Sequence, residues 1–139
     1  MIKYGIPFLL YDGQCEDALA YYTKVFHAQI TEKMTFREVG YEEDETRLNC
    51  IANSTFKLGE SLFYAADVID KRESPGWGNN RRISVWIELE TASELQELEQ
   101  RMLAGGSESI TPAEATSWNS LYAKLQDPFG IVWELNAQM

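Results

Sequence analysis

Carboxylate and aromatic side chains share one face of a predicted strand in the second half of the chain. Residues 82–90 alternate in polarity, which places three side chains two residues apart on the same side: Ser84, Trp86 and Glu88. The last predicted strand, residues 130–137, carries Glu134 between apolar neighbours. A carboxylate in such surroundings can anchor a ligand or act as a general base whose pKa is raised by burial.

A simpler interpretation of both carboxylates remains open. They can be solvated charges, or they can form ion pairs with nearby cations, which are Arg81, Arg82 and Lys124. The apolar neighbours of Glu134 favour a functional role for it, whereas Glu88 is more simply a solvated or paired charge.

The elements that would position these residues occur twice. Residues 6–26 and 82–103 each have the pattern of a strand followed by an amphipathic helix. The segments TFKLGESLFYAA and WNSLYAKLQDPFGIVWEL then each have the pattern of a hairpin. Strands are predicted at 3–11, 29–39, 47–58, 61–67, 82–90, 107–111, 119–126 and 130–137. The chain is therefore predicted to be one α+β domain, 1–139, made of two βαβββ modules, 1–68 and 81–139, with a linker at 69–80.

Local signals mark the ends of the two helices. His27 follows the first helix at a position that favours left-handed backbone, and Gly105-Gly106 stops the second. Thr91 and Glu94 are spaced as a capping box at the start of the second helix.

Composition excludes several classes of function. With 45% hydrophobic residues the chain is expected to fold, and a net charge of −10 makes nucleic acid an unlikely partner. The apolar run near the N-terminus is too short for a membrane span. The two cysteines, Cys15 and Cys50, form no CxxC motif and are expected to be reduced, so a cytoplasmic protein without a membrane partner is predicted.

Four stretches resemble one known family across nearly the whole chain. They are IPFLLYDGQCEDALAYYTKVFHAQI, FKLGESLFYAAD, SVWIELETASELQELEQRMLAGG and the ending W-x-x-x-Y-x-x-L-x-DPFG-x-x-W-E-L. Together they resemble the PhnB-like branch of the vicinal oxygen chelate (glyoxalase/bleomycin resistance/dioxygenase) superfamily. The resemblance implies paired βαβββ modules whose mixed sheet curls into a cup, and a homodimer.

The resemblance also implies where a metal ion would be held. Metal-dependent members use one side chain from the first strand and one from the last strand of each module, which here fall at Pro7, Thr55, Ser84 and Glu134. Only Glu134 is a good metal ligand, and the one histidine, His27, lies at a helix end. We therefore expect no metal site. We also expect no cofactor, because no Gly-rich strand-to-helix turn is present for a methyl donor.

The same resemblance gives the tryptophans candidate roles around the cup. Trp86 would stack on a planar ligand or fill the cup, and Trp118 would close one end of it or pack at a dimer seam. Trp77, flanked by Pro75, Gly76 and Gly78, is a candidate lid or a loop anchor.

Three functions remain open. The first is a metal-free protein that binds a small organic molecule through six residues: Ser84, Trp86, Glu88, Thr55, Trp77 and Trp118. The second is a lyase, isomerase or glyoxalase-like enzyme that uses Glu134 as a base or metal ligand. The third is a structural or regulatory dimer.

Overall fold

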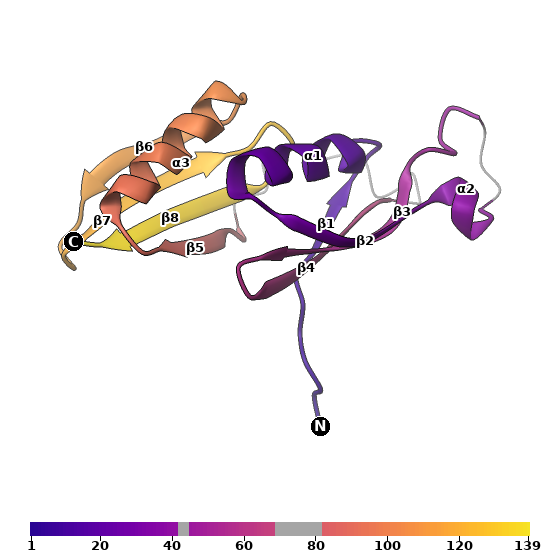
Figure 1. The fold of residues 1–139 in the computed structure, drawn as a ribbon, viewed down its shortest axis with the longest axis horizontal. Helices are drawn as coiled ribbons and strands as arrows, with labels where there is room; N and C mark the ends of the chain where they lie inside the picture. Colours follow the sequence, from indigo (N-terminus) through magenta and orange to yellow (C-terminus); the bar gives the residue numbers. More distant parts are fainter. Residues whose placement is uncertain (42–44, 69–81) are drawn as a thin grey trace. The chain divides into compact units, whose positions relative to one another are not determined.

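The computed structural model describes residues 1–41, 45–68 and 82–139. The chain divides into two compact units, Met1–Gly76 and Trp77–Met139, and each contains one four-stranded sheet (Figure 1). The predicted linker 69–80, with the Trp77 lid candidate, and Arg81 lie outside the described residues.

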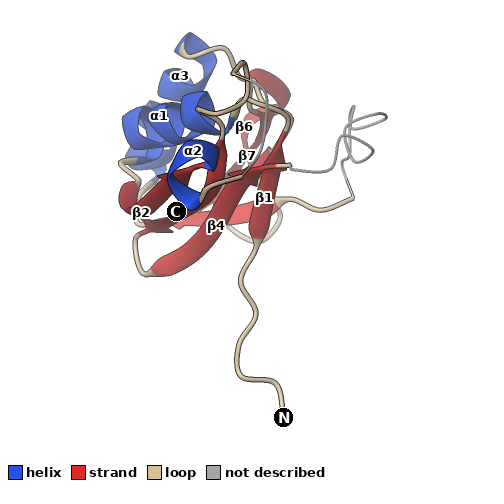
Figure 2. Cartoon of the chain, turned by 90° about the vertical axis from the view of Figure 1, so that its right-hand side faces the viewer, coloured by secondary structure: helices blue, strands red, loops and turns tan. Residues whose placement is uncertain are grey.

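The first unit has six elements. They are β1 (Phe8–Tyr11), α1 (Cys15–Phe26), β2 (Gln29–Thr35), α2 (Phe36–Val39), β3 (Ile51–Leu58) and β4 (Ser61–Asp67). The strand order is β1-β4-β3-β2, with β1 parallel to β4 and the other pairs antiparallel. Residues 1–7 form no helix or strand and extend away from β1 (Figure 2).

The second unit repeats this arrangement. Its elements are β5 (Val85–Leu89), α3 (Ala92–Ala104), β6 (Glu108–Ala115), β7 (Ser120–Gln126) and β8 (Val132–Gln138). The strand order is β5-β8-β7-β6, and β5 runs parallel to β8. Both units therefore have the predicted βαβββ order, and the prediction of an α+β fold with mixed sheets is confirmed.

Each long helix covers one face of its own sheet (Figure 1). The buried side of α1 is Cys15, Ala18, Leu19, Tyr22 and Val25. The ring of Tyr22 packs on Phe56, and its hydroxyl lies 2.7 Å from that of Tyr11. In the second unit Leu95, Leu98 and Met102 of α3 are buried, as are Trp133 and Leu135 of β8. Helix periodicity and strand alternation thus meet in a core on one side of each sheet.

The predicted helix ends are largely confirmed. His27 has left-handed backbone (φ 58°), and its N–H donates to the carbonyl oxygen of Tyr22. The Thr91 hydroxyl accepts from the N–H of Glu94 at 3.1 Å, which caps α3, and α3 ends at Gly105.

Several strand predictions were too long, the first among them because residues 3–7 form no strand, and one was too short. Residues 36–39 form α2 rather than the end of a strand, because Thr35 and Glu38 make a reciprocal capping box. Residues 47–50 lie before β3 and not within it, whereas β6 continues to Ala115 beyond the predicted end at residue 111.

A buried carboxylate shapes the last hairpin. Asp127 is 4% exposed, and its Oδ1 accepts from the backbone N–H groups of Phe129 and Ile131. Its Oδ2 accepts from the indole N–H of Trp133 at 2.8 Å. The DPFG-x-x-W pattern is therefore one hydrogen-bonded unit, and it sets how β8 follows β7.

Candidate functional site

The face of the second sheet opposite α3 carries two carboxylates and three aromatic rings. Alternation along β5 and β8 puts the apolar residues on the α3 side and leaves Trp86, Glu88 and Glu134 on the other. Tyr122 of β7 pairs with Asn136 of β8, and Trp86 of β5 pairs with Glu134. We call the residues Ser84, Trp86, Glu88, Trp118, Tyr122, Glu134 and Asn136 the β5–β8–β7 face.

Glu134 lies at the centre of one hydrogen-bond network on this face. The Ser84 hydroxyl donates to its Oε2, and the Tyr122 hydroxyl donates to its Oε1 at 2.5 Å. Burial alone would raise the pKa of Glu134, but these two bonds and the charge of Lys124 outweigh it and lower the pKa. The expectation of a raised pKa is therefore wrong, because it counted the apolar neighbours and not the donors on β7 and before β5.

Tyr122 has the opposite shift. Burial, the hydrogen bond to Glu134 and the charge of that carboxylate raise its pKa to about 12. Tyr122 therefore remains a hydroxyl donor at neutral pH, and Glu134 remains ionised.

Glu88 belongs to a second network that joins two tryptophans. The indole N–H of Trp86 donates to Oε1 of Glu88 at 2.9 Å, and the Asn136 amide donates to both carboxylate oxygens at 3.1 Å. The indole N–H of Trp118 donates in turn to Oδ1 of Asn136 at 3.2 Å. Across the described ranges neither Glu88 nor Glu134 takes part in an ion pair. Glu88 is exposed, so it is solvated as the simpler interpretation expected, and it also accepts these hydrogen bonds.

The three rings lie in one row, with half-buried Tyr122 between two exposed tryptophans. The ring centroids of Trp86 and Tyr122 are 6.1 Å apart, and those of Trp118 and Tyr122 are also 6.1 Å apart. Trp86 is 49% exposed and Trp118 is 56% exposed. Both tryptophans are fixed through their indole N–H groups, so much of each ring stays open to solvent.

Ser120 adds an unusual polar group to the same side of β7. It lies two residues before Tyr122, so alternation along the strand places both side chains on one face. Ser120 is 0% exposed, and its hydroxyl has no hydrogen-bond partner in the part of the chain that the structure describes. Such a buried hydroxyl costs free energy until a partner satisfies it.

The strand registers show which residues of the two units correspond. Phe8 pairs with Tyr64 across β1 and β4, as Trp86 pairs with Glu134 across β5 and β8. Thr55 pairs with Tyr64, as Lys124 pairs with Glu134. Thr55 therefore lies on β3 and not on the last strand of its unit, where the sequence had placed it. The counterpart of Glu134 in the first unit is Tyr64.

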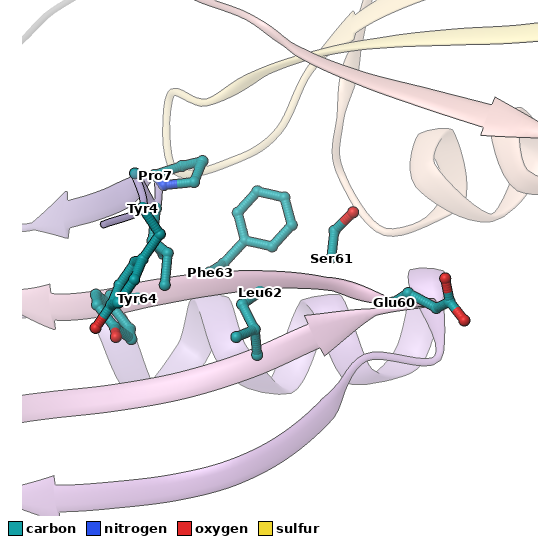
Figure 3. A pocket seen from close by; sticks show the side chains of 9 residues that line it. Tyr4, Pro7, Glu60, Ser61, Leu62, Phe63 and Tyr64 are labelled. Carbon is teal, nitrogen blue, oxygen red and sulfur yellow. The ribbon is translucent and has the colours of Figure 1, made fainter. Parts of the chain in front are cut away.

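The first unit has a pocket that the sequence analysis missed (Figure 3). Its volume is about 530 Å³, and it is lined by Tyr4, Gly5, Ile6, Pro7, Glu60, Ser61, Leu62, Phe63 and Tyr64. A hydrogen bond to Tyr4 is the main cause that raises the pKa of Tyr64, and Figure 3 shows the two side chains together. The pocket was not predicted because alternation over residues 3–7 indicated a continuation of the first strand.

The residues at the four family metal positions do not fit a metal ion. On this correspondence Tyr64 matches Glu134, and Ile6, rather than the expected Pro7, matches Ser84. Neither Ile6 nor Pro7 has a donor side chain, so the four positions offer one carboxylate and no histidine or thiolate. Both oxygens of that carboxylate already accept hydrogen bonds from hydroxyl groups. No group of three or more His, Cys, Asp or Glu side chains that could hold a metal ion occurs among the described residues.

The helices of the described segments are also too short or too polar to cross a membrane. This finding concerns α1, α2 and α3, which are the helices described.

Comparison with known proteins gives the family. The sequence model of the family described as 3-demethylubiquinone-9 3-methyltransferase matches residues 3–136. Protein YjdN of Escherichia coli (strain K12) is 23% identical over 140 residues, which cover 94% of this chain and 92% of YjdN.

Two solved structures have closely similar folds. Protein PA1353 from Pseudomonas aeruginosa is 19% identical with a TM-score of 0.83, and the match covers 99% of this chain and 98% of PA1353. A putative 3-demethylubiquinone-9 3-methyltransferase, PhnB protein, from Bacillus cereus is 20% identical with a TM-score of 0.79, covering 97% and 99% of the two chains. The chain belongs to the family described as 3-demethylubiquinone-9 3-methyltransferase, and it has the fold of the glyoxalase/bleomycin resistance/dioxygenase superfamily.

Proposed function

We propose that this protein binds a small organic molecule on the β5–β8–β7 face, without a metal ion held by the protein. The observation that carries the proposal is the row of three rings, Trp86, Tyr122 and Trp118, with two hydrogen-bonded carboxylates beside it. Exposed aromatic groups next to a few oriented polar groups are typical of ligand sites.

Each residue of the face has a distinct role in this proposal. Trp86 and Trp118 contribute ring surface for stacking, and Asn136 fixes the Trp118 ring through the bond to its indole N–H. Glu88 and Glu134 accept hydrogen bonds from the ligand in addition to those within the protein. Carboxylate oxygens have enough lone pairs for both.

Catalysis by Glu134 is less favoured than binding. A general base works best when its pKa lies near the working pH, and the pKa of Glu134 is shifted the other way. We therefore assign Glu134 as a ligand anchor and not as a base.

Methyl transfer is not proposed either, although the family description names it. Neither connection from first strand to helix, residues 12–14 or residues 90–91, has the Gly-x-Gly-x-x-Gly pattern that holds a dinucleotide-like cofactor. The proposal includes a homodimer, as the family resemblance implies, and a cytoplasmic location, as the two cysteines indicate. Sedimentation equilibrium should then give twice the chain mass of 15.9 kDa, and a mass of one chain would contradict this part.

The binding proposal is tested with labelled indole groups. In protein with ¹⁵N-labelled tryptophan, a bound compound from a chemically diverse panel should shift the indole N–H signals of Trp86 and Trp118. The buried indole of Trp133 serves as the internal control, because it donates to Asp127 on the other side of the sheet. A compound that binds without moving the Trp86 and Trp118 signals would place the site elsewhere.

Elemental analysis tests the metal-free part. Protein purified without chelators should contain less than one equivalent of Zn, Fe, Mn or Ni, and the ligand-induced shifts should persist in the presence of EDTA. A stoichiometric metal that disappears in a Glu134→Gln variant would contradict the proposal.

A further inference from the structure

We propose that the ligand of the β5–β8–β7 face is an organic cation, such as an aromatic or compact ammonium compound. This inference rests on the proposed function and narrows it to one chemical class.

The charge balance of the face is the first support. Among the described residues, the donors to Glu88 and Glu134 are neutral: two hydroxyl groups, an indole and an amide. Neutral donors stabilise a carboxylate without cancelling its charge. Lys124 is the cation beside Glu134, and it forms no ion pair with it within the described residues.

The exposed rings are the second support. The faces of indole and phenol rings carry negative potential, so a cation within about 6 Å of the ring centre is attracted to them. Because the indole N–H of Trp86 points to Glu88, the positive edge of that ring is engaged and does not face the ligand. Carboxylates and ring faces therefore favour the same sign of charge.

The Ser120 hydroxyl is the third support. It lies on the Tyr122 side of β7, fully buried and without a hydrogen-bond partner in the described ranges. A ligand O–H or N–H that reaches Ser120 beside Tyr122 would give this hydroxyl the partner that it lacks. On the described part of this face, an anionic ligand would instead meet two carboxylates, with Lys124 beside Glu134.

The inference is tested with two probes of nearly equal shape. In 4-hydroxyphenyltrimethylammonium a positive nitrogen stands where 4-tert-butylphenol has a carbon atom, and 4-hydroxybenzoate serves as the anion. Titration of ¹⁵N-indole-labelled protein should show the cation binding about tenfold more tightly than its neutral counterpart. The anion should bind more weakly than both.

Charge variants then locate the preference on the face. Glu88→Gln and Glu134→Gln keep hydrogen-bonding groups of similar shape, and each should reduce the preference for the cation. Lys124→Gln should increase it. Glu97→Gln, at an exposed position of α3, changes the net charge by the same amount and should leave the preference unchanged.

The outcomes separate this inference from the proposed function. Equal binding of the cation and 4-tert-butylphenol, with shifts of Trp86 and Trp118, would overturn the inference and keep the binding face. The inference also fails if the cation has no effect, or if the preference is the same in Glu97→Gln and the two face variants. A response of these indoles to other compounds of the panel would still support the proposed function.

Discussion

Glu134 accepts hydrogen bonds from two hydroxyl groups, and this arrangement decides at which pH its charge is lost. The carboxylate pKa is lower in the folded protein than in a free glutamate. Its contribution to stability is therefore present above the ordinary glutamate pKa and disappears as the pH falls through the folded value. The donors Ser84 and Tyr122 are thus part of the acid stability of the second unit.

Removal of the Tyr122 hydroxyl should change the pKa of Glu134. In Tyr122→Phe the pKa of Glu134 should rise relative to the wild type, because burial remains and one stabilising hydrogen bond is lost. Carboxyl ¹³C NMR measures the change, and the pH dependence of unfolding should become weaker in the acid range. Tyr41→Phe, at an exposed tyrosine of the first unit, is the control. An unchanged Glu134 pKa in Tyr122→Phe would contradict the network.

Asp127 makes a second prediction at the scale of single residues. Asp127→Ala leaves two backbone N–H groups and the Trp133 indole without their acceptor, and this should cost about 3 kcal/mol of unfolding free energy. Urea denaturation followed by circular dichroism measures the loss. Asp12→Asn, at an exposed aspartate, should change stability by less than about 0.5 kcal/mol. Equal stability of the two variants would refute the role of Asp127.

Sequence alternation was enough to place some residues of the site and not others. It predicted that Ser84, Trp86 and Glu88 share a face, because that requires only the period of one strand. The hydrogen bond from Tyr122 to Glu134 depends on the register between β7 and β8, which the period of side chains along one strand does not give. Because the register was unknown, Thr55 was assigned to the wrong strand. For the same reason the donors to Glu134 were not foreseen, and its pKa was expected to rise and not to fall.

At the scale of elements, the same T-x-x-E signal was recognised once and missed once. Thr91 and Glu94 follow a clear strand and precede a long amphipathic pattern, so the start of α3 was predicted. Thr35 and Glu38 lie within an alternating stretch that continues to Val39, and α2 is only four residues long. A helix of that length leaves no periodicity of its own, so strand alternation dominated the prediction.

The cap of α3 gives a prediction at this scale. Thr91→Ala removes the acceptor of the Glu94 N–H and should lower the unfolding free energy by about 1 kcal/mol. Thermal unfolding followed by circular dichroism measures the effect. Ser93→Ala, at an exposed position inside the same helix, should be neutral or slightly stabilising because alanine favours helices. If Thr91→Ala is as stable as Ser93→Ala, Thr91 does not cap α3.

At the scale of the whole molecule, duplication made the fold predictable. The two units share one strand order and one parallel pair, so evidence from each half supported the other. The symmetry helped less in predicting the site, because the corresponding residues Tyr64 and Glu134 have different chemistry. The repeat therefore predicts the framework, and the chemistry has to be found residue by residue.

The net charge of −10 gives a further prediction at this scale. An acidic protein concentrates cations near its surface, and added salt screens this effect. Calorimetric titration in increasing NaCl should therefore weaken the binding of 4-hydroxyphenyltrimethylammonium and leave that of 4-tert-butylphenol nearly unchanged. Parallel behaviour of the two compounds would show that charge does not direct the binding.

The division of the chain between Gly76 and Trp77 also separates a spectroscopic reporter, tryptophan, from a chemical one, cysteine. All four tryptophans, at positions 77, 86, 118 and 133, belong by sequence to the second unit, whereas Cys15 and Cys50 belong to the first. Cys15 is 0% exposed, and burial, followed by the charge of Asp67, raises the pKa of its thiol, so alkylation there requires the first unit to open. Tryptophan emission and iodoacetamide labelling at Cys15, resolved from half-buried Cys50 by peptide mass spectrometry, therefore follow the two halves separately. The difference between their midpoints in denaturant measures how strongly the halves are coupled.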